Sequence, residues 1–138
     1  MSKKKIAYIG AGPATLYSIQ TLLKLGKYDV EVFDMNDRAG GACYTGIPQF
    51  RFNTSFIDKL MDELTAAGVQ FHFQTTIGKD ILFSDLQKKF DRIVVAIGAQ
   101  VENMFGLEAK GGCVAGLTLL HDFNITHMHD FDKENYQH

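Results

Sequence analysis

A glycine-rich segment near the N-terminus, residues 10–15 (Gly-Ala-Gly-Pro-Ala-Thr), separates two stretches with different hydrophobic periodicity. Before it, residues 5–9 form a short apolar run, which is typical of a buried parallel strand. After it, apolar residues recur at helical spacing as far as Gly26, which is a suitable helix end. Residues 30–33 then have the pattern of a second strand. This order within about thirty residues predicts a βαβ unit.

The same alternation continues along the chain. Residues 36–53 predict a loop, residues 55–67 an amphipathic helix and residues 69–73 a third strand. Residues 80–90 predict a short helix, and residues 93–97 form the most apolar strand. Strands that alternate with helices favour an α/β fold class, a Rossmann-type parallel sheet with helices on both faces.

The length of 138 residues suits a single domain. We expect this domain over residues 1–120, followed by a polar and poorly ordered tail over residues 121–138. The net charge of −2 gives no electrostatic reason for a nucleic-acid or membrane partner. The apolar run at the N-terminus is too short for a signal peptide or a membrane span. We therefore expect a cytoplasmic protein without a metal site, in which the His and Asp residues of the tail are solvated.

The glycine-rich segment, called the glycine loop below, has the residue types that the diphosphate of a dinucleotide requires. Gly10 permits the tight turn, and Gly12 lets the diphosphate approach main-chain amides with no Cβ in the way. Pro13 suits the first position of a helix, whose N-terminus attracts an anion. The third glycine of the GxGxxG pattern is replaced by Thr15. This replacement predicts a wider contact between the helix and the strand.

An acidic residue follows the second predicted strand. Asp34 lies about 20 residues after Gly12, the separation expected for the acid of this motif. Its carboxylate can accept hydrogen bonds from an adenosine ribose and would repel a 2′-phosphate, so it favours FAD or NAD over NADP. The alternative is that Asp34 is a turn residue at the end of a strand.

Four further segments accompany the glycine loop: the glycine pair 40–41, residues 46–51 (Gly-Ile-Pro-Gln-Phe-Arg), residues 77–80 (Ile-Gly-Lys-Asp) and residues 95–99 (Val-Ala-Ile-Gly-Ala). Together they resemble the FAD domain of flavoproteins with two dinucleotide-binding domains. This family includes the glutamate synthase small subunit, the flavin-binding part of dihydropyrimidine dehydrogenase and, as a more distant member, adrenodoxin reductase. Residues 46–51 are the most specific part of the resemblance.

The resemblance implies FAD as the cofactor, and it implies a set of contacts. The residues that would hold the diphosphate are Gly10, Gly12, Pro13, Ala14 and Thr15, and Asp34 would bind the ribose. Gly41 and Ala42 would line the cofactor, and Arg51 would add positive charge. Ile77 would contact the adenine side, and Ala96 and Gly98 would lie beside the flavin. The family mostly has Glu in place of Asp34. No catalytic acid, base or nucleophile is expected, because the flavin itself carries the hydride chemistry.

Disulfide reductases of the same superfamily have two cysteines after the glycine pair. Cys43 occupies the first of these places, but Pro48 occupies the second. The resemblance therefore implies that Cys43 is a packed residue and has no role in thiol–disulfide chemistry.

By the same resemblance, the relatives pass electrons from NADPH through FAD to another acceptor, and a second glycine loop binds the NADPH. Residues 111–116 do not match such a loop. We therefore expect the FAD-binding portion of a larger NAD(P)H-dependent flavin oxidoreductase, which is inactive alone. Its partners would be the missing C-terminal part or a partner subunit, and its exposed apolar surface would favour homo-oligomers. The alternatives are an NAD-binding dehydrogenase domain and a non-enzymatic nucleotide-binding module.

Overall fold

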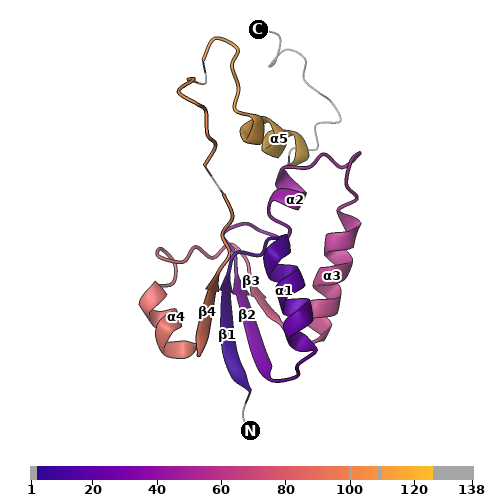
Figure 1. Cartoon of the computed structure of the whole chain (residues 1–138), viewed down its shortest axis with the longest axis vertical. Coiled ribbons are helices and arrows are strands. Elements are labelled where there is room, and N and C mark those ends of the chain that lie inside the picture. Colours follow the sequence, from indigo (N-terminus) through magenta and orange to yellow (C-terminus); the bar gives the residue numbers. More distant parts are fainter. Residues whose placement is uncertain (1–2, 100, 109, 126–138) are drawn as a thin grey trace.

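A parallel sheet forms the centre of the molecule (Figure 1). The computed structural model describes residues 3–99, 101–108 and 110–125. The strands are β1 (Lys4–Ile9), β2 (Tyr28–Phe33), β3 (Gln70–His72) and β4 (Arg92–Val95). They are arranged in the order β3-β2-β1-β4, and every neighbouring pair is parallel. The predicted parallel sheet is confirmed.

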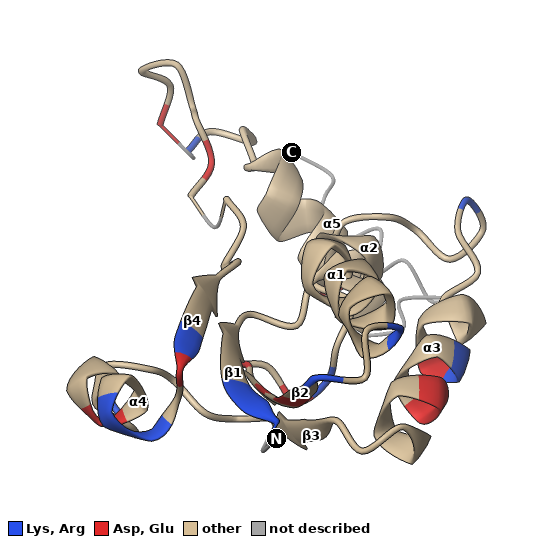
Figure 2. Ribbon diagram, turned by 60° about the horizontal axis from the view of Figure 1, so that its bottom comes forward, with Lys and Arg blue, Asp and Glu red and all other residues tan. Residues whose placement is uncertain are grey.

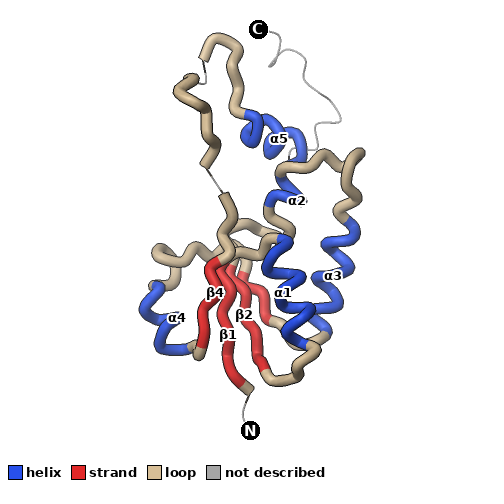
Figure 3. The backbone as a smooth tube through the Cα atoms, in the orientation of Figure 1, coloured by secondary structure: helices blue, strands red, loops and turns tan. Residues whose placement is uncertain are grey.

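Helices cover both faces of this sheet, as predicted. The helices are α1 (Pro13–Leu23), α2 (Ala42–Thr45), α3 (Ser55–Ala66), α4 (Phe83–Lys89) and α5 (Gly116–Ile125). Helices α1 and α3 lie on one face and α4 on the other, whereas α2 and α5 lie beyond the carboxyl ends of the strands (Figures 1 and 3). The carboxyl edge of the sheet is therefore surrounded by α2, α5 and the start of α1.

The alternation of side chains along β1 produces two cores. Ile6 and Tyr8 belong to a buried cluster that includes Leu16 of α1 and Leu60 of α3. Ala7 points to the opposite face, because successive residues of a strand alternate between faces. There it belongs to a smaller cluster with Phe33, Leu86 and Phe90, which lies under α4.

The most apolar strand lies at an edge of the sheet. β4 ends at Val95, two residues before the predicted end at residue 97. Val95 and Ile97 are 58% and 54% exposed. Within the part of the chain that the structure describes, no strand pairs with the outer side of β4. The most apolar predicted strand therefore has apolar residues that are more than half exposed in the described structure.

Two helices differ from the sequence-based expectation. The short helix α2 lies in the segment predicted as a loop, and it follows directly after Gly41. Helix α5 continues through Ile125, so the predicted tail does not begin at residue 121, and residues 126–138 lie outside the described part. None of the described helices is long and apolar enough to span a membrane.

Candidate functional site

The first turn of the glycine loop requires glycine. Gly10 has a φ of +100°, a conformation that side chains with a Cβ rarely adopt. A Cβ at this position would lie 2.3 Å from the carbonyl oxygen of Ala96, at the end of β4. The Gly10 amide also donates a hydrogen bond of 2.8 Å to the carbonyl of Phe33. The loop is thus held against the ends of both β2 and β4.

The second glycine faces open space. Gly12 is the N-cap of α1 and has an ordinary φ of −73°, and a Cβ built on it would meet nothing within 4 Å. Pro13 is the first residue of α1, as predicted. The amides of Ala14 and Thr15 in this first turn have no partner within the helix. The space beside Gly12 therefore has room for a ligand group that could accept hydrogen bonds from the amides of Ala14 and Thr15.

The electrostatics of this end of α1 favour an anion. A helix N-terminus carries partial positive charge, and the first turn of α1 contains no acidic residue to neutralise it. Figure 2 shows that Lys, Arg, Asp and Glu are present on α3 and α4, whereas α1 and α2 have none. The attraction for an anion therefore comes from main-chain dipoles at this site.

Thr15, which replaces the third glycine of the motif, is completely buried. Its hydroxyl donates a hydrogen bond of 2.6 Å to the carbonyl of Gly10. The side chain therefore fastens the start of α1 to the first turn of the glycine loop. Sequence reasoning treated this position as a departure from the motif and as a diphosphate contact, but it did not anticipate the hydrogen bond to Gly10.

Asp34 lies at the end of β2 and is 9% exposed. Its Oδ2 accepts a hydrogen bond of 2.6 Å from the amide of Ala11 in the glycine loop. Its Oδ1 accepts from the main-chain amide of Asn36 at 2.8 Å and from the side-chain amide of Asn36 at 2.9 Å. A carboxylate offers about four acceptor positions, so one remains. Asp34 is thus a turn residue that can still accept one more donor.

The glycine pair packs against the glycine loop. The amide of Gly40 donates to the carbonyl of Ala11 at 2.9 Å. Gly41 has a φ of +48°, and a Cβ built on it would lie 3.2 Å from the Cα of Gly12. Ala42 follows as the first residue of α2. The structure therefore brings Gly41 and Ala42, both predicted site residues, to the open side of the loop.

The remaining predicted residues are divided among three environments. Ala96 lies against Gly10, its amide donates to the carbonyl of Ile9 at 2.8 Å, and Gly98 follows with a φ of +69°. Ile77 packs beside the smaller core cluster under α4. Arg51 is exposed in a turn, and its guanidinium forms no hydrogen bond or ion pair with another described residue. Arg51 is therefore not fixed at the glycine loop.

Sequence reasoning missed an interaction that fixes the segment between β2 and α2. The guanidinium of Arg38 lies 3.6 Å from the ring centre of Tyr44, and its Nη2 is 2.7 Å from Oδ1 of Asp58. These contacts join the glycine pair region to α2 and α3. Arg38 and Asp58 are 20 residues apart in sequence, and neither contact follows a local periodicity, so no pattern indicated them.

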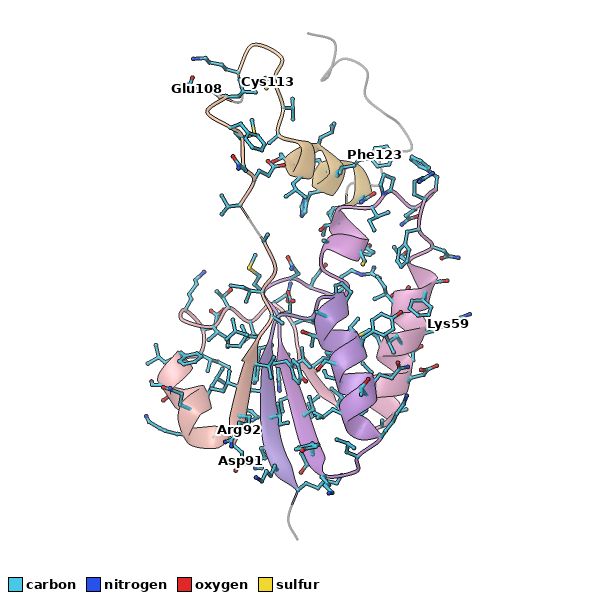
Figure 4. The ribbon with its side chains drawn as sticks, in the orientation of Figure 1. Lys59, Asp91, Arg92, Glu108, Cys113 and Phe123 are labelled. Atoms are coloured by element: carbon cyan, nitrogen blue, oxygen red, sulfur yellow. The ribbon has the colours of Figure 1, made fainter. Side chains whose placement is uncertain are left out.

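The structure shows no arrangement for metal or disulfide chemistry among the residues that it describes. Within these ranges no group of three or more His, Cys, Asp or Glu side chains could hold a metal ion. His127, His129 and Asp130 of the predicted tail lie outside them. Cys43 and Cys113 are both free. Figure 4 shows Cys113 on the connection before α5, and Asp91 and Arg92 at the opposite end of the sheet from α2.

Comparison with known proteins agrees with this geometry. Residues 9–57 match the model of the NAD(P)-binding Rossmann-like domain. The chain is 36% identical over 107 residues to the glutamate synthase [NADPH] small chain of Bacillus subtilis, which covers 78% of this chain and 22% of that protein. It is 33% identical over 128 residues to the beta subunit of the NADP(+)-dependent formate dehydrogenase of Moorella thermoacetica, covering 90% of this chain and 18% of that subunit.

A solved structure supports the fold assignment. FprA of Mycobacterium tuberculosis in complex with NADPH superposes with a TM-score of 0.79 at 20% identity, over 88% of this chain and 29% of FprA. The chain therefore spans less than a third of the length of each of these three proteins. The matched segment begins at the end of β1 and includes the glycine loop, Asp34 and the glycine pair. The chain thus contains an NAD(P)-binding Rossmann-like domain and is a homologue of the glutamate synthase small chains.

Proposed function

We propose that this chain binds the ADP half of FAD and forms the flavin-binding part of an NAD(P)H-dependent oxidoreductase. The observation that carries this proposal is the open space in front of Gly12, at a helix N-terminus whose first turn contains no acidic residue. A diphosphate placed there would accept hydrogen bonds from the amides of Gly12, Ala14 and Thr15. Pro13 would fix the direction of α1, and Gly10 would keep the loop close to the sheet.

Asp34 would bind the ribose of the adenosine. Its Oδ2 retains one acceptor position beside the Ala11 amide, and a ribose hydroxyl is a suitable donor. Because the carboxylate is a fixed negative charge, a 2′-phosphate at the same place would be repelled. The proposed preference is therefore for FAD or NAD over NADP at this loop.

The cofactor would continue from the glycine loop along the carboxyl edge of the sheet. Gly41 and Ala42 would line it on the α2 side, and Ala96 and Gly98 would line it beside the end of β4. Ile77 would lie toward the adenine, and Arg51 would add positive charge after a movement of its exposed side chain. FAD, when bound, would supply the hydride chemistry, and this chain's residues would bind and orient it.

A second candidate function is the binding of NAD by a dehydrogenase domain. The description of the matched family model as NAD(P)-binding favours this alternative. The two candidates predict the same glycine loop, so they differ in the ligand that binds most tightly. A non-enzymatic nucleotide-binding module would share the binding but have no role in electron transfer.

Titration of the purified chain with FAD tests the proposal. We expect saturable quenching of flavin fluorescence and displacement of FAD by excess ADP, with NADH as a weaker competitor than FAD and NADPH as the weakest, because Asp34 would repel its 2′-phosphate. Tighter binding of NADH than of FAD would support the dehydrogenase alternative. Failure of all these dinucleotides to bind would contradict both.

We also propose that turnover requires parts of the longer relatives that this chain does not cover. The chain spans about a fifth of the length of the two oxidoreductase relatives described above. The FAD-loaded chain should therefore fail to reduce a dye with NADPH. Dye reduction at a rate that rises with NADPH concentration would contradict this part of the proposal.

A further inference from the structure

Helix α5 is attached to α2 through an unusual polar contact. The side-chain amide of Asn124 donates a hydrogen bond of 2.9 Å from Nδ2 to the carbonyl of Thr45, the last residue of α2. Asn124 is 4% exposed, and it is the one buried residue that α5 contributes among the described residues. Leu117 and Ile125 of the same helix are 42% and 40% exposed. Asn124 is therefore the most deeply buried side chain of α5.

This contact lies at one end of a short series of interactions that reaches the glycine loop. The main-chain amide of Thr45 donates to the carbonyl of Gly41 at 2.9 Å, and the Thr45 hydroxyl donates to the same carbonyl at 3.2 Å. Gly41 in turn packs against Gly12, with its built Cβ 3.2 Å from the Gly12 Cα. A change in the position of α5 can thus reach Gly12 through α2 alone.

The Asn124 amide is only half satisfied. Its Nδ2 is paired with Thr45, but its buried Oδ1 has no hydrogen-bond partner among the residues that the structure describes. At the other end of α5, the amide of Leu117 donates to a carboxylate oxygen of Glu102, on the exposed connection that follows β4. A helix at the periphery of the fold, with one fully buried side chain, can open locally at a lower free-energy cost than a core helix. Its position can therefore respond to what happens at α2.

We propose that Asn124 is a positioning residue of the dinucleotide site, which couples the docking of α5 to the placement of α2 beside Gly12. This inference rests on the proposed function. A dinucleotide that contacts Gly12 and Gly41 would restrict the movement of α2, because Thr45 is hydrogen-bonded to Gly41. The Thr45 carbonyl would then keep its hydrogen bond to Asn124, and α5 would stay docked. Because coupling between two sites is reciprocal, the loss of the Asn124 hydrogen bond weakens dinucleotide binding by the same free energy with which the dinucleotide stabilises the docking of α5.

Three variants test this coupling. Asn124→Asp keeps the size of the side chain but replaces the donor with an acceptor that faces the Thr45 carbonyl. Asn124→Leu removes both polar groups at similar volume. Thr118→Ala is the matched control, because Thr118 is an exposed residue of the same helix. For each variant, the dissociation constant for FAD and the hydrogen exchange of α2 and α5 with and without FAD are measured.

We expect FAD to slow exchange in α5 of the wild-type chain and of Thr118→Ala. Both Asn124 variants should bind FAD about three- to tenfold more weakly, the range of one hydrogen bond, and FAD should no longer protect α5. Both variants should remain folded and unfold cooperatively in urea, because Asn124 belongs to neither core cluster. If Asn124 only stabilised α5, its variants would show faster hydrogen exchange in α5 but unchanged affinity for FAD.

The outcomes separate this inference from the proposed function. Normal binding of FAD by the wild-type chain together with unchanged affinity in both Asn124 variants would overturn the inference alone. A wild-type chain that binds no FAD would overturn the proposed function, and the inference with it.

Discussion

The carboxylate of Asp34 accepts a hydrogen bond of 2.6 Å from the amide of Ala11, and this bond joins the end of β2 to the glycine loop. The carboxylate therefore has a part in shaping the loop before any ligand arrives. The same oxygen keeps one acceptor position, so loop geometry and the proposed ribose contact depend on a single side chain. A substitution here should affect stability and binding together.

Asp34→Asn tests this double role. The amide that replaces the carboxylate can present only one oxygen, so one of the bonds to Ala11 and Asn36 is lost. We expect the free energy of unfolding to fall by about 1–3 kcal/mol, as for a buried group left unpaired, and FAD binding to weaken. Urea denaturation and FAD titration measure the two effects. Asp37→Asn is the control, because Asp37 is an exposed neighbour and should change stability by less than about 0.5 kcal/mol. Equal stability of both variants would contradict the account.

The close approach of Gly10 to β4 can be separated from its backbone conformation. Gly10 and Gly78 have nearly the same φ, +100° and +97°, but only a Cβ at Gly10 would meet another group, the Ala96 carbonyl. Gly78→Ala should cost about 1–2 kcal/mol of stability, the strain of the left-handed region. Gly10→Ala should cost at least about 2 kcal/mol more, or leave little soluble protein. Urea denaturation and soluble yield measure this difference, and equal losses in the two variants would be inconsistent with the close packing.

Most of the architecture follows from patterns that are local in sequence. The apolar run of residues 5–9, the glycine loop and the helical periodicity after it each depend on neighbouring residues. The predicted parallel sheet with helices on both faces is confirmed for this reason. The end of β4 was predicted two residues too late, because residues 96 and 97 continue the apolar pattern. Hydrophobicity reports which contacts a strand is suited to make. It does not report that the described chain leaves the outer side of β4 unpaired.

The features that the sequence did not predict depend on contacts between elements that follow no local periodicity. The bond from Ala11 to Asp34, the contact of Arg38 with Tyr44 and the bond from Asn124 to Thr45 each join different elements. No spacing rule indicates such pairs in advance. Helix α2 has four residues, which is too short for a helical period to appear in the sequence.

Thr15 provides a third prediction. Thr15→Val keeps the shape of the buried side chain but removes the hydroxyl that donates to Gly10, so we expect a loss of about 1–2 kcal/mol of stability. Thr15→Ser keeps a hydroxyl and should lose less. Thr21→Val removes a comparable hydroxyl bond, to the carbonyl of Tyr17, at an exposed position, and should change stability by less than about 0.5 kcal/mol. Thermal and urea unfolding distinguish these cases. A stability loss from Thr15→Val no larger than that from Thr21→Val would refute the role of the buried hydroxyl.

The outer side of β4 should promote association of the isolated chain. An unpaired edge strand with exposed apolar residues is a site for contact between copies. We expect Val95→Lys to reduce the association seen by sedimentation velocity at increasing protein concentration. Leu25→Lys is the matched control, since Leu25 and Val95 are both 58% exposed. Association that is reduced equally by both substitutions would point to general hydrophobicity and away from the β4 edge.

The central claim is that a diphosphate binds at the glycine loop, and amide NMR of the ¹⁵N-labelled chain titrated with FAD tests it most directly. The account predicts saturable shifts of the amides of Gly12, Ala14 and Thr15, with smaller shifts at Gly41. In Gly12→Val these shifts should disappear while the rest of the spectrum is retained, because the space in front of Gly12 is open and the added side chain fills only that space. Saturable shifts elsewhere in the chain, with these amides unmoved, would contradict the account.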